Sequence, residues 1–111
     1  MEIGFASNKL AKLCNSQKEM RGKLGPRVAQ RLAQRLNELH AATTLEDMRH
    51  LPGARCHELT ADRKGQLAVD LIHPKRLIFQ PDHDLVPTKP DGGLDWNAVT
   101  HILVVEITDY H

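Results

Sequence analysis

The chain has 111 residues, with 41% hydrophobic and 26% charged side chains and a formal net charge of +1; this composition is typical of one soluble globular domain over residues 1–111 and excludes a strongly basic protein. Only four residues are aromatic, so the core must consist mainly of Leu, Ile and Val, and an aromatic cage for a ligand is disfavoured. No run approaches the roughly 18 apolar residues that a membrane span requires, and the first residues do not resemble a signal peptide, so we expect a cytoplasmic protein with no membrane contact.

The first part of the chain is expected to form a short strand followed by two helices. Ile3 and Phe5 alternate with smaller or polar residues, as in a strand. Ser7 is a suitable N-cap for a helix that extends to Met20 and is ended by the glycines that follow. Pro26 suits the first turn of the second helix, in which apolar side chains recur at spacings of four, four and three: Val28, Leu32, Leu36 and Leu39.

Basic side chains are concentrated in the first 40 residues, which contain eight Lys or Arg against three acidic residues and therefore carry +5. Arg27, Arg31 and Arg35 recur at every fourth position of the second helix, so they form a row of cations. Two interpretations stay open for this row. It is either an ordinary solvated helix face or a ridge that follows the phosphates of a nucleic acid.

The second half of the chain changes from a helical to a strand-like pattern after a short helical turn that ends at Pro52. Four strands are expected, within residues 55–59, 66–71, 76–80 and 101–107. The second strand alternates apolar and polar residues, which indicates a sheet covered on one face. The last strand is apolar on both of its faces and is expected to be central. A Pro- and Gly-rich surface loop separates the last two strands. The order predicts an α+β fold in which two N-terminal helices pack on one face of a mostly antiparallel twisted sheet.

Histidines and cations occur where metal-free RNA cleavage could use them. His57 lies in the first of the four strands, His111 follows the last, and Arg63, Lys64 and Arg76 are basic. Such cleavage needs a base for the 2′-hydroxyl, an acid for the leaving 5′-oxygen and positive charge for the phosphate. Spacing alone leaves open that these histidines are ordinary surface or core residues.

A metal site is disfavoured. Asp82, His83 and Asp84 offer ligand atoms, but adjacent residues cannot all face one ion. Cys14 and Cys56 lack the further ligands of a structural zinc site. We therefore expect no metal and no cofactor.

Three ordered motifs resemble the RelE/ParE superfamily of toxins from bacterial type II toxin–antitoxin pairs, and more closely its HigB-like branch, often labelled plasmid maintenance killer protein. They are the segment "HELTADRKG", the strand "KRLIF" and the terminal "DYH". The resemblance implies the RelE/ParE toxin fold and a translation-dependent, metal-free mRNA endoribonuclease, or mRNA interferase, that acts at the ribosomal A site. The implied partners are a HigA-like helix-turn-helix antitoxin, mRNA and the 70S ribosome, with operator DNA bound only through the antitoxin.

The resemblance also assigns site residues. His57 and His111 would transfer protons, Arg76 would meet the scissile phosphate, Asp109 would orient His111, and Tyr110 would stack on a base or orient the phosphate. The RNA-binding candidates are basic side chains: Arg63, Lys64 and Lys75, with the row Arg27, Arg31 and Arg35.

The sequence departs from the family pattern at "LTADR", which the family usually writes "LKGDR". Thr60 thus stands where a lysine often stands, which should weaken stabilisation of the transition state unless Lys64 or Lys75 compensates. The loop from Pro81 to Gly93 is longer than in the smallest family members.

Two other functions stay open: a ParE-like, non-enzymatic inhibitor of a protein target such as DNA gyrase, and a catalytically weakened relative that binds an antitoxin.

The sequence also leaves open which face of the sheet the end of the last strand points to. A regular last strand would place Asp109 and His111 on the face of Val105 and Ile107. Either the chain twists or bulges after Ile107, or the helices cover the opposite face.

Overall fold

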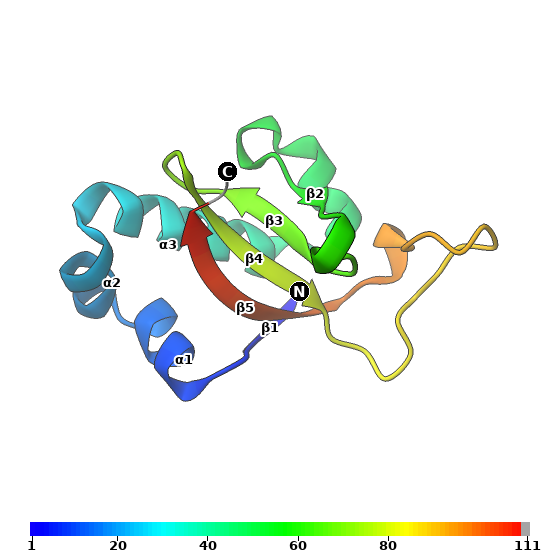
Figure 1. The fold of residues 1–111 in the computed structure, drawn as a ribbon, viewed down its shortest axis with the longest axis horizontal. Helices are drawn as coiled ribbons and strands as arrows, with labels where there is room; N and C mark the ends of the chain where they lie inside the picture. The colour runs from blue at the N-terminus through cyan, green and yellow to red at the C-terminus, as the bar shows by residue number, and fades with distance from the viewer. Residues whose placement is uncertain (110–111) are drawn as a thin grey trace.

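An open, twisted sheet of five strands carries the helices on one side (Figure 1) in a computed structural model that describes residues 1–109. The strands are β1 (Glu2–Phe5), β2 (His57–Glu58), β3 (Leu67–Asp70), β4 (Lys75–Pro81) and β5 (His101–Asp109). Their order across the sheet is β1-β5-β4-β3-β2. Only β1 and β5 pair in parallel, and the other pairs are antiparallel. The predicted α+β class with a mostly antiparallel sheet is confirmed.

Three helices, rather than the two expected, precede β2. They are α1 (Asn8–Asn15), α2 (Gln17–Leu24) and α3 (Pro26–Ala41). The Ser7 hydroxyl caps α1 as expected, but the Ser16 hydroxyl accepts a hydrogen bond from Glu19 N and so starts a second helix. The prediction of one continuous first helix is therefore wrong, whereas α3 begins at Pro26 as expected.

The main core lies between the helices and one face of the sheet. Its buried side chains come from α1 to α3 and from alternate positions of the strands, including Leu32, Leu39, Leu67, Val69, Leu77, Phe79, Ile102 and Val104. Among residues 1–109, the opposite face carries a small cluster of Leu59, Ala68 and Ile78, with Val105 packed against it. That face is therefore partly open. β4 is the middle strand of the five, and β5 is an inner strand that pairs with β1 and β4.

A β-bulge in β5 resolves the parity question. Phe79 pairs with Val104 and Ile78 pairs with Glu106, so Val105 is an extra residue on β5. After the bulge Ile107 packs on the helix-side core, which leaves Glu106 on the open face. The bulge thus lies before Ile107, and Asp109 has the parity of the helix-covered face.

Short 3₁₀ helices and one long loop make the remaining connections. The 3₁₀ helices are η1 (Leu45–His50), η2 (Pro52–Ala54), η3 (Ala61–Arg63) and η4 (Trp96–Ala98). The loop between β4 and β5 extends away from the sheet (Figure 1) and exposes Leu85 and Val86. None of the helices in residues 1–109 is long and apolar enough to cross a membrane.

Ala61 adopts a backbone conformation that favours glycine. Its φ of 58° lies in the left-handed region, where the Cβ of an L-residue is crowded. Ala61→Gly should raise the free energy of unfolding by about 0.5–1 kcal/mol, because the relief of strain exceeds the added flexibility of the unfolded chain. Urea denaturation followed by circular dichroism measures the effect.

Ala98→Gly is the matched control for Ala61→Gly, since Ala98 is exposed, lies in a 3₁₀ helix and does not have a positive φ. This control should lower stability, because glycine there only adds unfolded-state entropy. Equal losses of stability in both variants would contradict the proposed strain at Ala61.

Candidate active site

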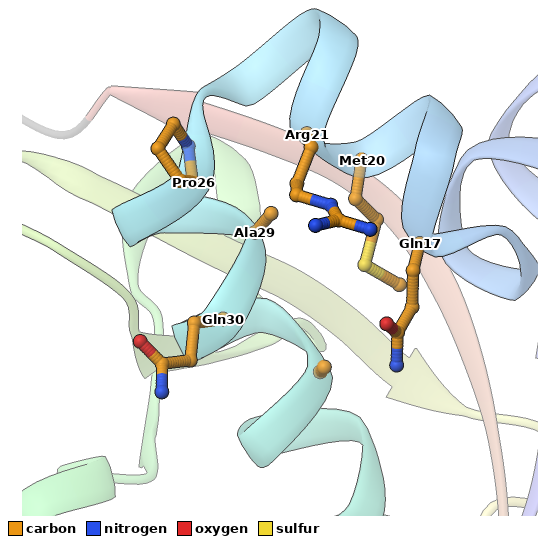
Figure 2. A pocket seen from close by; sticks show the side chains of 7 residues that line it. Gln17, Met20, Arg21, Pro26, Ala29 and Gln30 are labelled. Carbon is orange, nitrogen blue, oxygen red and sulfur yellow. The ribbon is translucent and has the colours of Figure 1, made fainter.

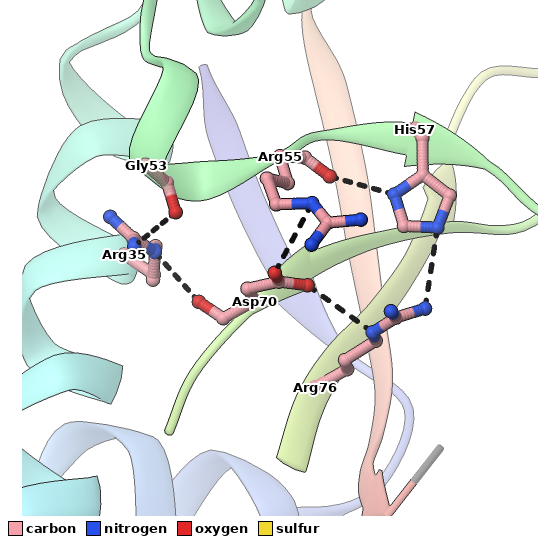
Figure 3. A network of polar contacts seen from close by, with 6 residues as sticks. All are labelled: Arg35, Gly53, Arg55, His57, Asp70 and Arg76. Carbon is pink, nitrogen blue, oxygen red and sulfur yellow. Dashed lines mark hydrogen bonds and ion pairs between the residues drawn. The ribbon is translucent and has the colours of Figure 1, made fainter. Parts of the chain in front are cut away.

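The open face of the sheet brings together two of the predicted site residues, His57 and Arg76. His57 pairs with Ala68 across β2 and β3, and Arg76 pairs with Asp70 across β3 and β4. Ala68 packs in the small cluster on the open face, and strand alternation places Asp70 and Arg76 on the same side. Figure 3 shows their side chains meeting there.

Hydrogen bonds assign the tautomer of His57. Its Nδ1 lies 2.7 Å from the carbonyl oxygen of Arg55, which can only accept, so Nδ1 carries the proton. Its Nε2 lies 3.4 Å from Arg76 Nη1, which can only donate. Nε2 therefore presents a lone pair on the open face beside a guanidinium, which is the state that a general base requires.

Asp70 holds two arginines at this site. Its Oδ1 lies 3.2 Å from Arg76 Nε, and its Oδ2 lies 3.6 Å from Arg55 Nε. The Arg76 side chain is 17% exposed, whereas that of Arg55 is 68% exposed. The carboxylate thus orients one enclosed cation beside His57 and one accessible cation next to it, an arrangement suited to an anionic oxygen.

Another arginine, Arg63, lies on the same face. Arg63 forms an ion pair with Glu106, and its Nη1 donates to Gln66 Oε1 over 2.9 Å. Glu106 faces the open side because it pairs with Ile78, and Thr108 pairs with Arg76. Arg63 is therefore on the same face as His57, with its charge partly neutralised.

The remaining candidates near the end of β5 are placed differently. Lys75 Nζ lies 2.9 Å from Asp109 Oδ1, so these two residues pair with each other at the end of the sheet. Asp109 has the helix-side parity, so it does not share the face of His57, and its predicted role of orienting His111 stays a prediction. Tyr110 and His111 lie outside the described residues.

The predicted row of arginines on α3 is wrong at one position. Arg27 is exposed and Arg31 half-buried, but the side chain of Arg35 is 3% exposed and forms hydrogen bonds inside the protein. Arg35 follows Leu32 by three residues and precedes Leu39 by four, which places it on the buried face of the helix. Arg27 and Arg31 belong to the helix layer, on the other side of the sheet from His57.

Metal ligands do not gather in the described part of the chain: within residues 1–109 no three His, Cys, Asp or Glu side chains are close enough to hold an ion. His83 has a structural contact instead, since its Nε2 accepts from the backbone N–H groups of Thr100 and His101 over 3.2 and 3.3 Å. Burial raises the pKa of Cys14 to about 11 and that of Cys56 to about 12, so both are protonated thiols at neutral pH.

A pocket on the helix side of the sheet lacks this chemistry. Figure 2 shows this pocket, of about 320 Å³, between α2 and α3, lined by Gln17, Met20, Arg21, Pro26, Ala29, Gln30 and Ala33. It contains a single cation and no group that transfers protons near neutral pH. The open face with His57 and Arg76 is therefore the candidate active site.

Trp96 anchors the long loop beside this site. Its indole Nε1 donates to Glu58 Oε2 over 3.1 Å, and Arg49 stacks with Cζ 3.8 Å from the ring centroid. Trp96→Phe should lower the free energy of unfolding by about 1–2 kcal/mol through loss of the hydrogen bond and weaker stacking. Chemical denaturation followed by far-ultraviolet circular dichroism measures this loss.

Leu85→Ala serves as the control for the loop, because Leu85 is 88% exposed. It should change the stability by less than about 0.5 kcal/mol. If Trp96→Phe were as stable as the Leu85 variant, the anchoring role of Trp96 would be rejected.

Two residues of the site, Arg55 and Asp70, were not among the sequence-based candidates. The sequence could have indicated Asp70, because in an alternating strand it points to the same face as Ala68 and to the opposite face from Leu67 and Val69. No sequence pattern indicated Arg55, because its position depends on its own left-handed backbone conformation, with φ 47°, at the end of η2.

The fold and this face define an α+β domain with arginines and a histidine on the open side of its sheet. No protein-family model matches the sequence, and no curated protein matches it. A solved structure described as a YoeB/ParE toxin from Agrobacterium tumefaciens is similar over 100% of both chains, with a TM-score of 0.54 and 8% identity. At that identity the similarity shows the fold alone, and the expected RelE/ParE toxin-like fold is thereby confirmed.

Proposed function

We propose that this protein is the toxin of a type II toxin–antitoxin pair and acts as a translation-dependent mRNA endoribonuclease of the HigB-like kind. One observation carries the proposal. The Nε2 lone pair of His57 lies beside the Arg76 guanidinium on the open face of a RelE/ParE-like fold.

The proposed cleavage needs no metal. His57 takes the proton from the 2′-hydroxyl, whose oxygen attacks the adjacent phosphorus, and the bond from phosphorus to the 5′-oxygen breaks. Arg76 stabilises the charge that develops on the phosphoryl oxygens, with Arg55 as a second, more accessible cation. The motif resemblance adds His111 as the acid that protonates the leaving 5′-oxygen, with Tyr110 beside it.

Other basic side chains serve substrate binding in this proposal. Lys64 is exposed and follows Arg63 in the chain; in this proposal it meets RNA phosphates and offsets the absence of a lysine at Thr60. In this proposal Arg27 and Arg31 contact ribosomal RNA from the helix side. The proposed partner that neutralises the toxin is a HigA-like helix-turn-helix antitoxin, which alone contacts operator DNA.

Induced expression tests the proposal. The expected result is growth arrest with mRNA cut inside translated codons, and no cleavage when translation is blocked. Arrested DNA replication with intact mRNA would instead support a ParE-like inhibitor of a protein target such as gyrase. Normal growth together with binding of an antitoxin would indicate a catalytically weakened relative.

A further inference from the structure

The buried guanidinium of Arg35 connects two segments that carry the candidate site (Figure 3). Its Nε donates to the carbonyl oxygen of Asp70 over 2.7 Å, and its Nη2 donates to the carbonyl oxygen of Gly53 over 2.7 Å. Its Nη1 donates to Glu38 Oε1 over 3.0 Å. One side chain of α3 thus joins η2 to the end of β3.

The two joined segments hold the groups on the open face. Gly53 lies two residues before Arg55, whose carbonyl oxygen accepts from His57 Nδ1. Asp70 is the last residue of β3, and its carboxylate pairs with Arg55 and Arg76. The contacts of Arg35 therefore set the distance between the backbone that orients His57 and the carboxylate that orients Arg76.

The β-sheet by itself holds these segments only weakly. β2 has two residues, and its pairing with β3 consists of His57 with Ala68 and Glu58 with Leu67. The chain from Gly53 to Cys56 has no backbone pairing with β3, so it is connected to that strand by the Arg35 hydrogen bonds and by the ion pair between Arg55 and Asp70.

Arginine suits this position better than other side chains. Burying a charge is costly unless it is paired and hydrogen-bonded, and the Glu38 carboxylate supplies the opposite charge. The planar fork of five N–H donors can hold two carbonyl oxygens and a carboxylate at once, whereas the single ammonium of lysine cannot span them.

We propose that Arg35 is a positioning residue, which holds η2 against the end of β3 and so places His57 beside Arg76. Its effect on catalysis rests on the proposed function, but its effect on the geometry of His57 does not.

Arg35→Met and Arg35→Lys test this inference with two readouts. The first is the nuclear magnetic resonance shift of the His57 ring nitrogens at a fixed pH. The second is single-turnover cleavage of mRNA on programmed ribosomes. In Arg35→Met we expect changed ring shifts and a maximal rate lower by about 10²-fold, with little change in KM, because a misplaced base slows the chemical step and not binding. Arg35→Lys should fall between Arg35→Met and the natural chain.

Leu39→Ala is the control, since Leu39 is fully buried in α3 but belongs to the main core. At a temperature where it is folded, it should keep the His57 shifts and the maximal rate despite its lower stability. If Arg35→Met does not fold, the comparison between Arg35→Lys and Leu39→Ala decides.

Folded Arg35 variants with unchanged His57 shifts and an unchanged maximal rate would overturn the inference. If the natural chain cuts no mRNA, the proposed function fails, and the His57 shifts alone decide the role of Arg35.

Discussion

His57→Ala should lower the rate of mRNA cleavage on translating ribosomes by about 10²–10⁴-fold, because it removes the proposed general base. The two groups that are hydrogen-bonded to His57 do not replace it, because a guanidinium has no lone pair and a backbone carbonyl is not basic. Induced His57→Ala should consequently allow growth where the natural chain arrests it. Single-turnover cleavage measures the rate, and growth after induction measures the toxicity.

His50→Ala is the matched control for His57→Ala, since His50 is an exposed histidine at the end of η1. It should cleave mRNA at the natural rate. Unfolding of both variants must show that they are folded, with stabilities within about 1 kcal/mol of the natural chain. Cleavage by folded His57→Ala at the natural rate would remove His57 from the mechanism.

Arg76→Ala should lower the maximal cleavage rate by about 10²–10³-fold, because the enclosed guanidinium is the cation beside His57. Arg76→Lys should recover only part of this loss. A lysine keeps the charge, but one ammonium cannot meet the Asp70 carboxylate and a phosphoryl oxygen with the fixed geometry of a guanidinium. Cleavage at saturating ribosome concentration separates this effect from weaker binding.

Arg21→Ala is the control for Arg76→Ala, because Arg21 is an exposed arginine on α2, on the helix side of the sheet. It changes the net charge equally and should leave the maximal rate unchanged. A loss in Arg76→Ala that appears only in KM would mean that Arg76 binds RNA without stabilising the transition state.

Local patterns in the sequence predicted most of the fold. The proline at the start of α3 and the leucine spacing after it identified that helix, and the alternation in residues 66–71 identified β3 and its covered face. These predictions succeeded because the apolar period of a segment and its end signals act within a few residues.

The features that the sequence analysis did not predict have two different origins. The Val105 bulge in β5 exists because Phe79 and Val104 face the helices while Ile78 and Glu106 face outward, and no pattern within residues 101–107 reveals that pairing. The division between α1 and α2 was within reach of the sequence, since Ser16 followed by Glu19 is an N-cap signal.

The candidate site was predicted in part. The motifs identified His57 and Arg76, and the structure brings these two residues together. Asp109 pairs with Lys75, so its predicted role of orienting His111 stays a prediction, and Arg35 lies in the interior. Asp70 could have been identified from the alternation in β3, whereas Arg55 became visible only in the tertiary structure, because its ion pair with Asp70 joins positions that are 15 residues apart in the numbering.

The sequence by itself determined the α+β class, the helix of residues 26–41, the strands and the basic motifs, since each depends on local periodicity and side-chain chemistry. Only the tertiary structure decided which face of the sheet stays open, where the β5 bulge lies and what Arg35 contacts. The physical reason is that burial and pairing are set between elements. An arginine on α3 has the same helix propensity whether its guanidinium faces water or two backbone carbonyls. The burial of Arg35 was therefore fixed by packing between elements.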